Sequence, residues 1–342
     1  MKKFGSFLIS FLLGIIFFYG VSKYIVNWQE LKSGFLGFSL AKGVIFFFLM
    51  FLGLVIDTLR WREILKSKGQ VFSFKKLLAP NLACFAISYL IPIAVFWADF
   101  FRSGALKVKS DLEREKGLAS AFIDRILSSF STLIIILFGF LTFLLRAGFL
   151  PDDLNHFFLG LIAFCAFVLI FLLVFFFYSN ILEKTGIFNY FLNGVNHGLP
   201  EKLKKEILIF FKKENFCFLR NSLILSFFKV FIGLVQFWVL AFFLEYPLSL
   251  VNLFAIFGVS SAALQTPISA DLGSHDLVTA LAFERLGMAR NVGAAFAMIF
   301  RGANLILALI GIVFFIEINF QIFKYHFLRK IERVLCFLKR NN

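Results

Sequence analysis

Residues 250–286 read LVNLFAIFGVSSAALQTPISADLGSHDLVTALAFERL. The segment is apolar at both ends, but its middle contains a proline and several polar residues: Pro267, Asp271, Gly273, His275 and Asp276. Proline breaks a helix, and ionised side chains are costly within hydrocarbon. We therefore expect a re-entrant hairpin of two short half-helices. Lipid tolerates such a break only where protein or a water-filled cavity covers the freed backbone groups.

Residues 77–101 have the same character. Pro92 interrupts this second apolar segment, and Asn81 adds a polar group to its first part. A single span would bury both against lipid, so we expect another re-entrant hairpin here. The structural breaks that the sequence predicts are Pro92, Pro267 and Gly273.

The composition places the chain in a membrane. Of its 342 residues, 60% are hydrophobic and 54 are Phe, and the mean hydropathy is +0.89. A soluble domain could not bury so much apolar surface. About 20 apolar residues cross the hydrocarbon core, and six segments qualify: 4–22, 40–58, 118–145, 156–178, 221–244 and 290–316. The expected fold is an all-α polytopic membrane protein with six full spans and two re-entrant hairpins.

The net charge of +15 fits membrane topology better than nucleic-acid binding, because the basic residues cluster between apolar segments. Four segments hold most of them: 60–76, 102–116, 184–220 and 324–340. Basic loops of membrane proteins face the cytoplasm. All four segments fall on one side only if both interrupted segments leave the membrane on the side where they entered. This interpretation places both termini in the cytoplasm and the chain in the cytoplasmic (inner) membrane.

The two halves of the chain resemble each other. The sequence GLASAFIDR at 117–125 aligns with GAAFAMIFR at 293–301, and a proline precedes each glycine by 25 and 26 residues. Each half, 1–145 and 156–316, then holds three spans and one hairpin, so the second half is inverted in the membrane. Inverted repeats with broken helices are typical of transporters; chance similarity of two apolar helices is the alternative. Residues 317–342 are expected to form a basic amphipathic tail on the cytoplasmic face.

Two arginines lie deep in the predicted spans. At 1.5 Å per residue, Arg125 lies about 12 Å and Arg301 about 16 Å into its span. A guanidinium at this depth costs at least about 2.5–3.5 kcal/mol, so each arginine needs a partner or a wet cavity. One hypothesis is that the two arginines bind a phosphate together. The other is a structural ion pair with nearby carboxylates, and the two are compatible.

Other polar residues complete the candidate substrate-binding set: Arg60, Asp99, Arg102, Asp124, Lys229, His275 and Asp276. Three of them have ordinary alternatives. Arg60 could anchor the membrane interface, Lys229 could snorkel to the headgroups, and His275 could make a structural hydrogen bond. No residue is assigned a catalytic role.

Together these features resemble the flippase-like membrane region of lysylphosphatidylglycerol synthases, over about residues 5–318. The motifs that resemble the family are Leu59-Arg60-Trp61-Arg62, Leu90-Ile91-Pro92 followed by Asp99 and Arg102, Ile123-Asp124-Arg125, and Pro267 with Gly273 and Asp276 before Arg301. Ala98 replaces a family glycine, and the second glycine-rich loop is reduced to Gly273. The resemblance implies translocation of a lipid or polyprenyl-linked substrate. The aminoacyl-transferase domain of the full synthases does not follow, so that activity is not expected.

The sequence contains no Walker A loop, no metal-ligand spacing and no nucleophile elbow. We therefore expect no cofactor and no metal. The expected partners are anionic phospholipids or polyprenyl-phosphate-linked lipids, together with a possible enzyme at the cytoplasmic face. A lipid flippase or scramblase is the leading hypothesis. An intramembrane lipid-modifying transferase, or a scaffold for such an enzyme, is the alternative.

Overall fold

The computed structural model describes residues 38–91, 95–109, 112–148, 201–265 and 273–340, and their regular elements are all helical. In chain order the helices are α3 (Leu40–Ser67), α4 (Phe74–Leu90), α5 (Val95–Lys109), α6 (Arg114–Arg146), α10 (Glu201–Phe210), the 3-10 helix η3 (Lys213–Asn215), α11 (Phe216–Phe243), α12 (Leu250–Ala263), α13 (Ser274–Arg285) and α14 (Arg290–Arg340). The predicted spans 4–22 and 156–178, together with Pro92 and Pro267, lie outside the described residues.

Within the described residues, four helical stretches are long and apolar enough to cross a membrane: Leu40–Ser67, Arg114–Arg146, Lys213–Phe243 and Arg290–Gln321. They contain the spans predicted at 40–58, 118–145 and 290–316 and nearly all of the one predicted at 221–244. These four predictions are confirmed as apolar helices. The chain is therefore an all-α membrane protein, as its composition predicted.

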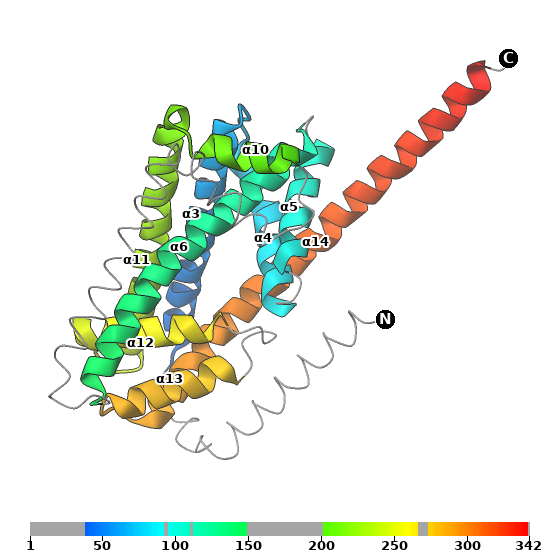
Figure 1. Ribbon diagram of the computed structural model, residues 1–342. Helices are drawn as coiled ribbons and strands as arrows, with labels where there is room; N and C mark the ends of the chain where they lie inside the picture. The colour runs from blue at the N-terminus through cyan, green and yellow to red at the C-terminus, as the bar shows by residue number, and fades with distance from the viewer. Residues whose placement is uncertain (1–37, 92–94, 110–111, 149–200, 266–272, 341–342) are drawn as a thin grey trace.

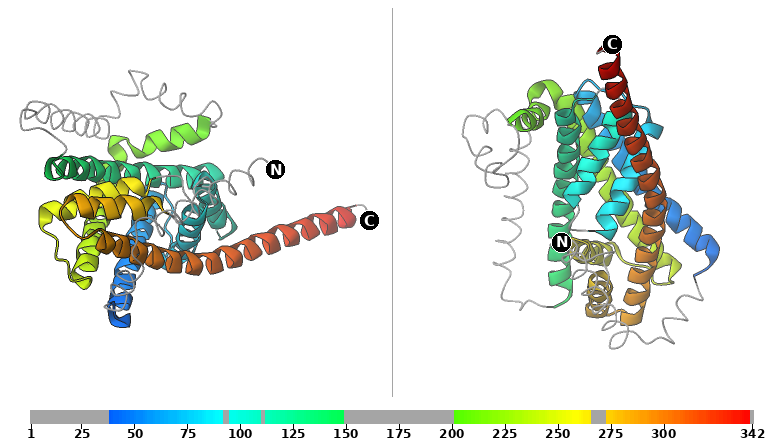
Figure 2. Two further views of the ribbon diagram at one scale, coloured as in Figure 1. Left: turned by 90° about the horizontal axis from the view of Figure 1, so that it is seen from below. Right: turned by 90° about the vertical axis from the view of Figure 1, so that its right-hand side faces the viewer.

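Each interrupted segment contains two short helices that contact each other, α4 with α5 and α12 with α13. The two pairs lie toward opposite ends of the bundle. In Figure 1, α4 and α5 lie toward the end that α10 crosses, and α12 and α13 form the other end. The right-hand view of Figure 2 shows the same separation. Local residues fix the starts of the second pair: Ser249 Oγ accepts from the N–H of Asn252 at 3.3 Å, and Gly273, with φ of 78°, precedes α13.

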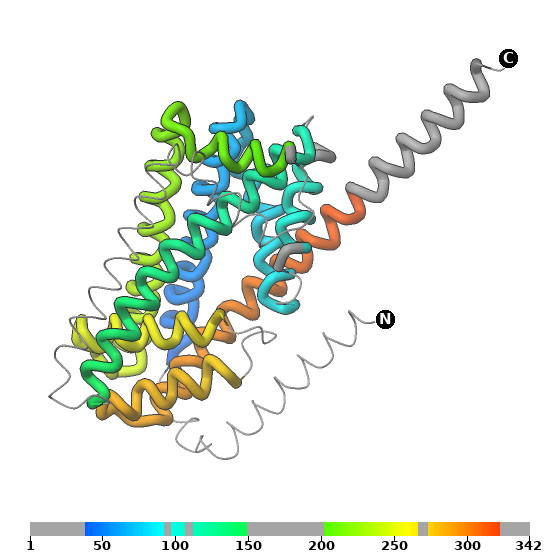
Figure 3. The backbone as a smooth tube through the Cα atoms, viewed as in Figure 1, coloured from blue at the N-terminus to red at the C-terminus, as the bar shows by residue number. Residues whose placement is uncertain are grey.

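The two halves pack on each other reciprocally. The last long helix of the first half, α6, packs on α12 of the second half, and α14 of the second half packs on α4 of the first. Between these two contacts, α3 packs along α11. The tube in Figure 3 lets the reader follow how α3 leads into α4 at one end and α11 into α12 at the other. Consecutive helices also contact each other in both halves: α3 with α4, α4 with α5 and α5 with α6, and likewise α11 with α12, α12 with α13 and α13 with α14.

Glycine residues make the reciprocal contacts close. A Cβ on Gly258 of α12 would lie 2.4 Å from the Cα of Gly139 on α6, and a Cβ on Gly311 of α14 would lie 2.4 Å from the carbonyl oxygen of Leu82 on α4. Any side chain at these positions would separate the helices, which is how small residues usually act at helix interfaces in membranes.

Two further features concern the end of α14 and the position of α10. Helix α14 runs without a break from Arg290 to Arg340, so the expected tail continues the last span as helix up to Arg340. Helix α10 is tied to the end of α3, because Lys68 Nζ lies 3.1 Å from Glu206 Oε2. Burial lowers the pKa of the Lys68 ammonium, and Glu206 opposes that shift.

Candidate functional site

A cluster of buried charges lies where α3, α5 and α6 meet. Asp124 of α6 accepts hydrogen bonds from Arg60 Nε of α3 at 2.7 Å and from Arg102 Nη1 of α5 at 3.0 Å. The side chains of the two arginines are only 2% and 4% exposed. Desolvation of a charge is costly unless it is paired and hydrogen-bonded, so Asp124 is the group that makes burial of both arginines tolerable.

Neutral groups hold the Arg102 guanidinium in place. Its Nη1 also donates to Asn81 Oδ1 at 3.0 Å, and its carbon lies 4.4 Å from the centre of the Trp61 ring. Asn81 Nδ2 donates to Thr58 Oγ1 at 3.0 Å, and Trp61 Nε1 donates to Ser120 Oγ at 3.0 Å. Planar stacking on an aromatic face and directed donors are the features that distinguish arginine from lysine at such sites.

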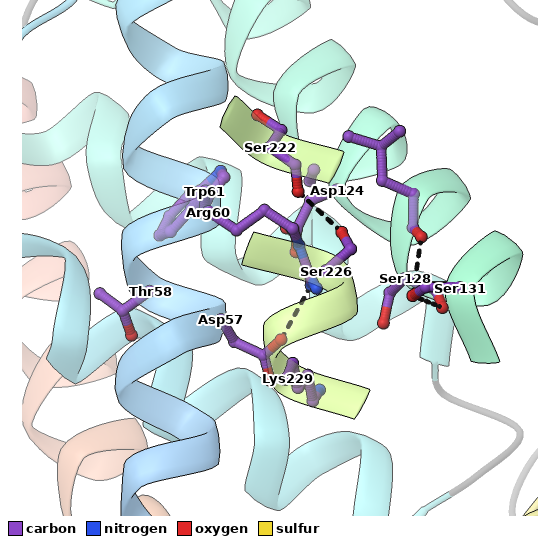
Figure 4. Close-up of polar contacts among 12 residues, drawn as sticks. Asp57, Thr58, Arg60, Trp61, Asp124, Ser128, Ser131, Ser222, Ser226 and Lys229 are labelled. Carbon is purple, nitrogen blue, oxygen red and sulfur yellow. Dashed lines mark hydrogen bonds and ion pairs between the residues drawn. The ribbon is translucent and has the colours of Figure 1, made fainter. Parts of the chain in front are cut away.

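A second carboxylate connects this cluster to the other half of the chain. Asp57 of α3 lies 2.9 Å from Arg60 Nη2 and also accepts from Lys229 Nζ of α11. Figure 4 shows Ser226 and Lys229 of α11 beside Asp57 and Arg60 of α3. Ser222, Ser226 and Lys229 follow each other at spacings of four and three residues, so they lie on one face of α11, toward the cluster.

A third carboxylate joins Arg125 to the cluster. Arg125 Nε of α6 donates to Asp99 Oδ2 of α5 at 2.6 Å, and Arg102 Nη2 lies 3.7 Å from Asp99 Oδ1. Asp99 is 1% exposed, whereas the Arg125 side chain is 34% exposed. Arg125 is therefore anchored at its base and reaches an accessible surface.

These charges line one pocket of about 240 Å³. Its wall contains four cations and three carboxylates, which leaves one excess positive charge: Arg60, Arg102, Arg125 and Lys229 against Asp57, Asp99 and Asp124. The Lys229 side chain is 37% exposed, similar to that of Arg125. The accessible part of the pocket thus presents two cations, and the buried part presents two arginines behind them.

Two donors in the pocket wall lack a hydrogen-bond acceptor among the described residues. They are Arg60 Nη1 and Arg102 Nε, and both atoms are buried. Two oxygens, Asp57 Oδ1 and Asp99 Oδ1, also lack a hydrogen bond, but each has an arginine nitrogen at 2.9 and 3.7 Å. Buried polar groups in proteins almost always have partners, and an unpaired one indicates a ligand, a water or a functional site.

Three predicted polar residues of α13 and α14, His275, Asp276 and Arg301, lie outside this pocket. Arg301 Nη1 of α14 donates to Asp276 of α13, and the same carboxylate accepts from the N–H of Gly273 at 3.2 Å. His275 is fully buried, packs on Phe300 at 5.5 Å between ring centres, and has no hydrogen bond at either ring nitrogen within the described residues. None of these side chains lines the pocket.

The structure therefore corrects part of the sequence interpretation. Arg125 and Arg301 do not meet in this pocket, because each pairs with a carboxylate of the short helix before it. Arg60 is not an interfacial anchor, since it is buried. Lys229 pairs with Asp57 instead of snorkelling, and the structural hydrogen bond considered for His275 is not found among the described residues.

The pocket gathers six predicted site residues: Arg60, Asp99, Arg102, Asp124, Arg125 and Lys229. It also contains residues that the prediction left out of the site, above all Asp57 and a polar face of α6 with Ser128, Ser129 and Thr132. Two spacings in the sequence could have indicated that these residues belong to the site. Asp57 lies three residues before Arg60, and the α6 residues follow Arg125 by three, four and seven.

Comparison with known proteins gives one match. The family model for the Lysylphosphatidylglycerol synthase TM region matches residues 4–311. No curated protein and no solved structure matches the chain.

Proposed function

Because the chain belongs to the family of the lysylphosphatidylglycerol synthase transmembrane region, we propose that it binds an anionic lipid by its phosphate and moves that lipid between leaflets. The observation that supports this most is the pair of buried, unpartnered arginine donors, Arg60 Nη1 and Arg102 Nε, in a pocket with excess positive charge. A phosphate oxygen is the acceptor that such donors favour, because charge-assisted hydrogen bonds are the strong ones.

Arg125 and Lys229 would receive the phosphate first. Both are about one-third exposed at the pocket, while Arg60 and Arg102 lie behind them. A phosphate held by the exposed pair would approach the unpartnered donors from the accessible side. Each hydrogen bond between charged groups contributes about 1.5–3 kcal/mol to binding of the phosphate. The excess positive charge of the pocket disfavours the additional ammonium group of a zwitterionic headgroup.

The arrangement of helices supports movement as well as binding. The reciprocal contacts α6 with α12 and α14 with α4 are what two repeats of opposite orientation would make around a shared axis. We therefore propose six full spans, with α4–α5 and α12–α13 as re-entrant hairpins that enter from opposite faces. Transporters built this way alternate access by rocking one repeat against the other around a central site.

The basic segments support one orientation in the membrane. The junction of α3 with α4, the junction of α5 with α6, and α10 all lie toward the same end of the bundle in Figure 1. These are basic segments of the sequence. By the positive-inside rule this end faces the cytoplasm, in the cytoplasmic membrane.

Transbilayer movement in proteoliposomes tests the proposal. Phosphatidylglycerol with a fluorescent acyl chain should cross protein-containing vesicles faster than protein-free ones, and labelled phosphatidylcholine should not. Lys229→Gln removes one cation and should slow the movement about tenfold, the effect of losing one charged hydrogen bond. Arg220→Gln is the matched control, because Arg220 is exposed on the same helix and does not line the pocket.

Equal rates in wild type and Lys229→Gln would contradict a phosphate site in this pocket. Equal movement of the two lipids would contradict its selection of an anionic headgroup. Lipid binding without movement would favour the transferase or the scaffold over the flippase.

A further inference from the structure

The lining of the pocket contains two chemically different sets of polar side chains. One set is the seven charged side chains described above. The other set is neutral, with hydroxyl groups from Ser88 of α4 and from Ser128, Ser129 and Thr132 of α6, and the amide of Gln265 after α12. Hydroxyl groups on an apolar span are satisfied by the helix's own carbonyl groups, by a neighbouring helix, by water or by a polar ligand.

The hydroxyl groups of α6 form a line that begins at Arg125. Residues at spacings of three, four and seven share one face of a helix. At a rise of 1.5 Å per residue, Thr132 lies about 10 Å along α6 from Arg125. A molecule whose phosphate contacts Arg125 would therefore extend its next group along Ser128, Ser129 and Thr132.

A neighbouring serine shows that the pocket-facing hydroxyl groups differ from ordinary helix serines. Ser131 is 2% exposed, and its Oγ donates to backbone carbonyls of Leu127 at 3.2 Å and Ser128 at 3.0 Å. Such bonds to the preceding turn satisfy a serine within a helix. No hydrogen bond is found for the hydroxyl of Ser129 or Thr132 within the described residues.

The charge of the pocket excludes a cationic headgroup. Asp57, Asp99 and Asp124 each already face at least one arginine or lysine, and the wall as a whole has one excess positive charge. Beside the neutral residues, an ammonium group would lose its hydration without gaining an unpaired carboxylate as counterion, which is unfavourable.

We propose that the occupant is a phosphodiester lipid whose headgroup has uncharged hydroxyl groups, as glycerol or a sugar does, and no amine. The phosphate contacts Arg125 and Lys229, and the hydroxyl groups of the headgroup bond to Ser128, Ser129 and Thr132. This inference rests on the proposed function and names the lipid class for the same site. The volume fits, since about 240 Å³ equals roughly eight water volumes of about 30 Å³, more than a bare phosphate fills.

Lipid binding by the purified full chain tests the inference. Phosphatidylglycerol and phosphatidylethanol have the same phosphodiester charge, but the headgroup of phosphatidylethanol has no hydroxyl group. Native mass spectrometry of lipid titrations should show phosphatidylglycerol binding about tenfold more tightly, a factor that corresponds to 1.4 kcal/mol. Phosphatidylinositol should bind like phosphatidylglycerol, and lysyl-phosphatidylglycerol should bind more weakly than both.

Two variants test whether the preference for phosphatidylglycerol over phosphatidylethanol depends on the hydroxyl groups of α6. The double variant Ser129→Ala/Thr132→Val keeps nearly the same side-chain volumes and should bring the ratio of the two affinities close to one. Ser131→Ala is the matched control on the same helix and should leave the ratio at about ten, as estimated from the hydrogen bonds lost.

The outcomes separate this inference from the proposed function. Equal binding of phosphatidylglycerol and phosphatidylethanol, both weakened by Lys229→Gln, would overturn the hydroxyl-bearing headgroup and leave the phosphate site standing. Lysyl-phosphatidylglycerol binding as tightly as phosphatidylglycerol would overturn the exclusion of an amine. Failure of every anionic lipid to bind would remove both the inference and the proposed function.

Discussion

The helix pairs α4–α5 and α12–α13 each form the same type of ion pair with the long helix that follows. The residues that surround this ion pair differ between the two regions. In both, a carboxylate of the second short helix pairs with an arginine of the next long helix, Asp99 with Arg125 and Asp276 with Arg301. In both, a glycine eight residues before that arginine packs on the same short helix: Gly117 against Ser103, and Gly293 against Ala280.

The residue before each arginine makes the difference. Asp124 precedes Arg125 and pairs with two buried arginines, whereas Phe300 precedes Arg301 and packs with Phe46, Phe237 and His275. The first region is therefore a charged pocket, and the second is part of an aromatic core. The shared ion pair is explained by the fold, because it fastens each short helix pair to its long helix. The unshared charges are the ones that need a ligand to explain them.

Matched positions on α3 and α11 extend the comparison. Counting 176 residues from Arg60 and Trp61, the distance from Arg125 to Arg301, leads to Gln236 and Phe237. Trp61 donates to Ser120, and Phe237 packs on Phe296, the residue that matches Ser120, at 4.9 Å between ring centres. The contact between the helices is retained while its chemistry changes from polar to aromatic.

The largest expected effect comes from removing the carboxylate that distinguishes the two regions. Asp124→Asn leaves Arg60 and Arg102 buried without their shared counterion, and should reduce the free energy of unfolding by about 3–5 kcal/mol. Thermal unfolding in detergent measures this as a lowered midpoint. Glu113→Gln at the N-cap of the same helix is the control, since the pair of Glu113 with Lys116 is exposed and contributes about 1 kcal/mol or less. A similar midpoint for both variants would mean that the first region does not depend on its charges.

Removing the carboxylate of Asp57 is expected to have a smaller effect, a gain in lipid affinity. This carboxylate accepts from Lys229 in the absence of lipid, so it competes with a phosphate for that cation. Asp57→Asn should raise the affinity for phosphatidylglycerol severalfold, up to about tenfold, the factor equivalent to about 1.4 kcal/mol. Lipid titration measures the gain, and slower transbilayer movement should accompany it. Unchanged or weaker binding would show that Asp57 does not compete with the lipid.

Much of the helical framework is predictable from sequence, because apolar runs and interrupting prolines are local signals. The ion pairs are harder to predict from sequence. Arg60 and Asp124 are separated by 64 residues and Asp57 and Lys229 by 172, and nothing local indicates which acid meets which base. For Arg125 and Arg301 the sequence left two compatible hypotheses, a joint phosphate site and an ion pair with a nearby carboxylate. The structure shows the ion pair at each arginine and brings only Arg125 to the pocket.

The polar face of α6 was missed for another reason. Ser128, Ser129 and Thr132 are compatible with an ordinary apolar span, and only the pocket shows that they belong to the site. The basic residues after 317 change the polarity of α14 without ending the helix, so polarity alone does not indicate where this helix ends.

Parallel lipid titrations of Arg125→Gln and Arg301→Gln test most directly whether the charged pocket of the first half is the lipid site. Both variants break an ion pair with a carboxylate of a short helix, and thermal unfolding of each variant checks that it remains folded. Arg125→Gln should weaken phosphatidylglycerol binding at least about tenfold, as loss of a charged hydrogen bond predicts, and Arg301→Gln should leave it unchanged. Equal loss of binding in both variants, or loss in Arg301→Gln alone, would contradict the account.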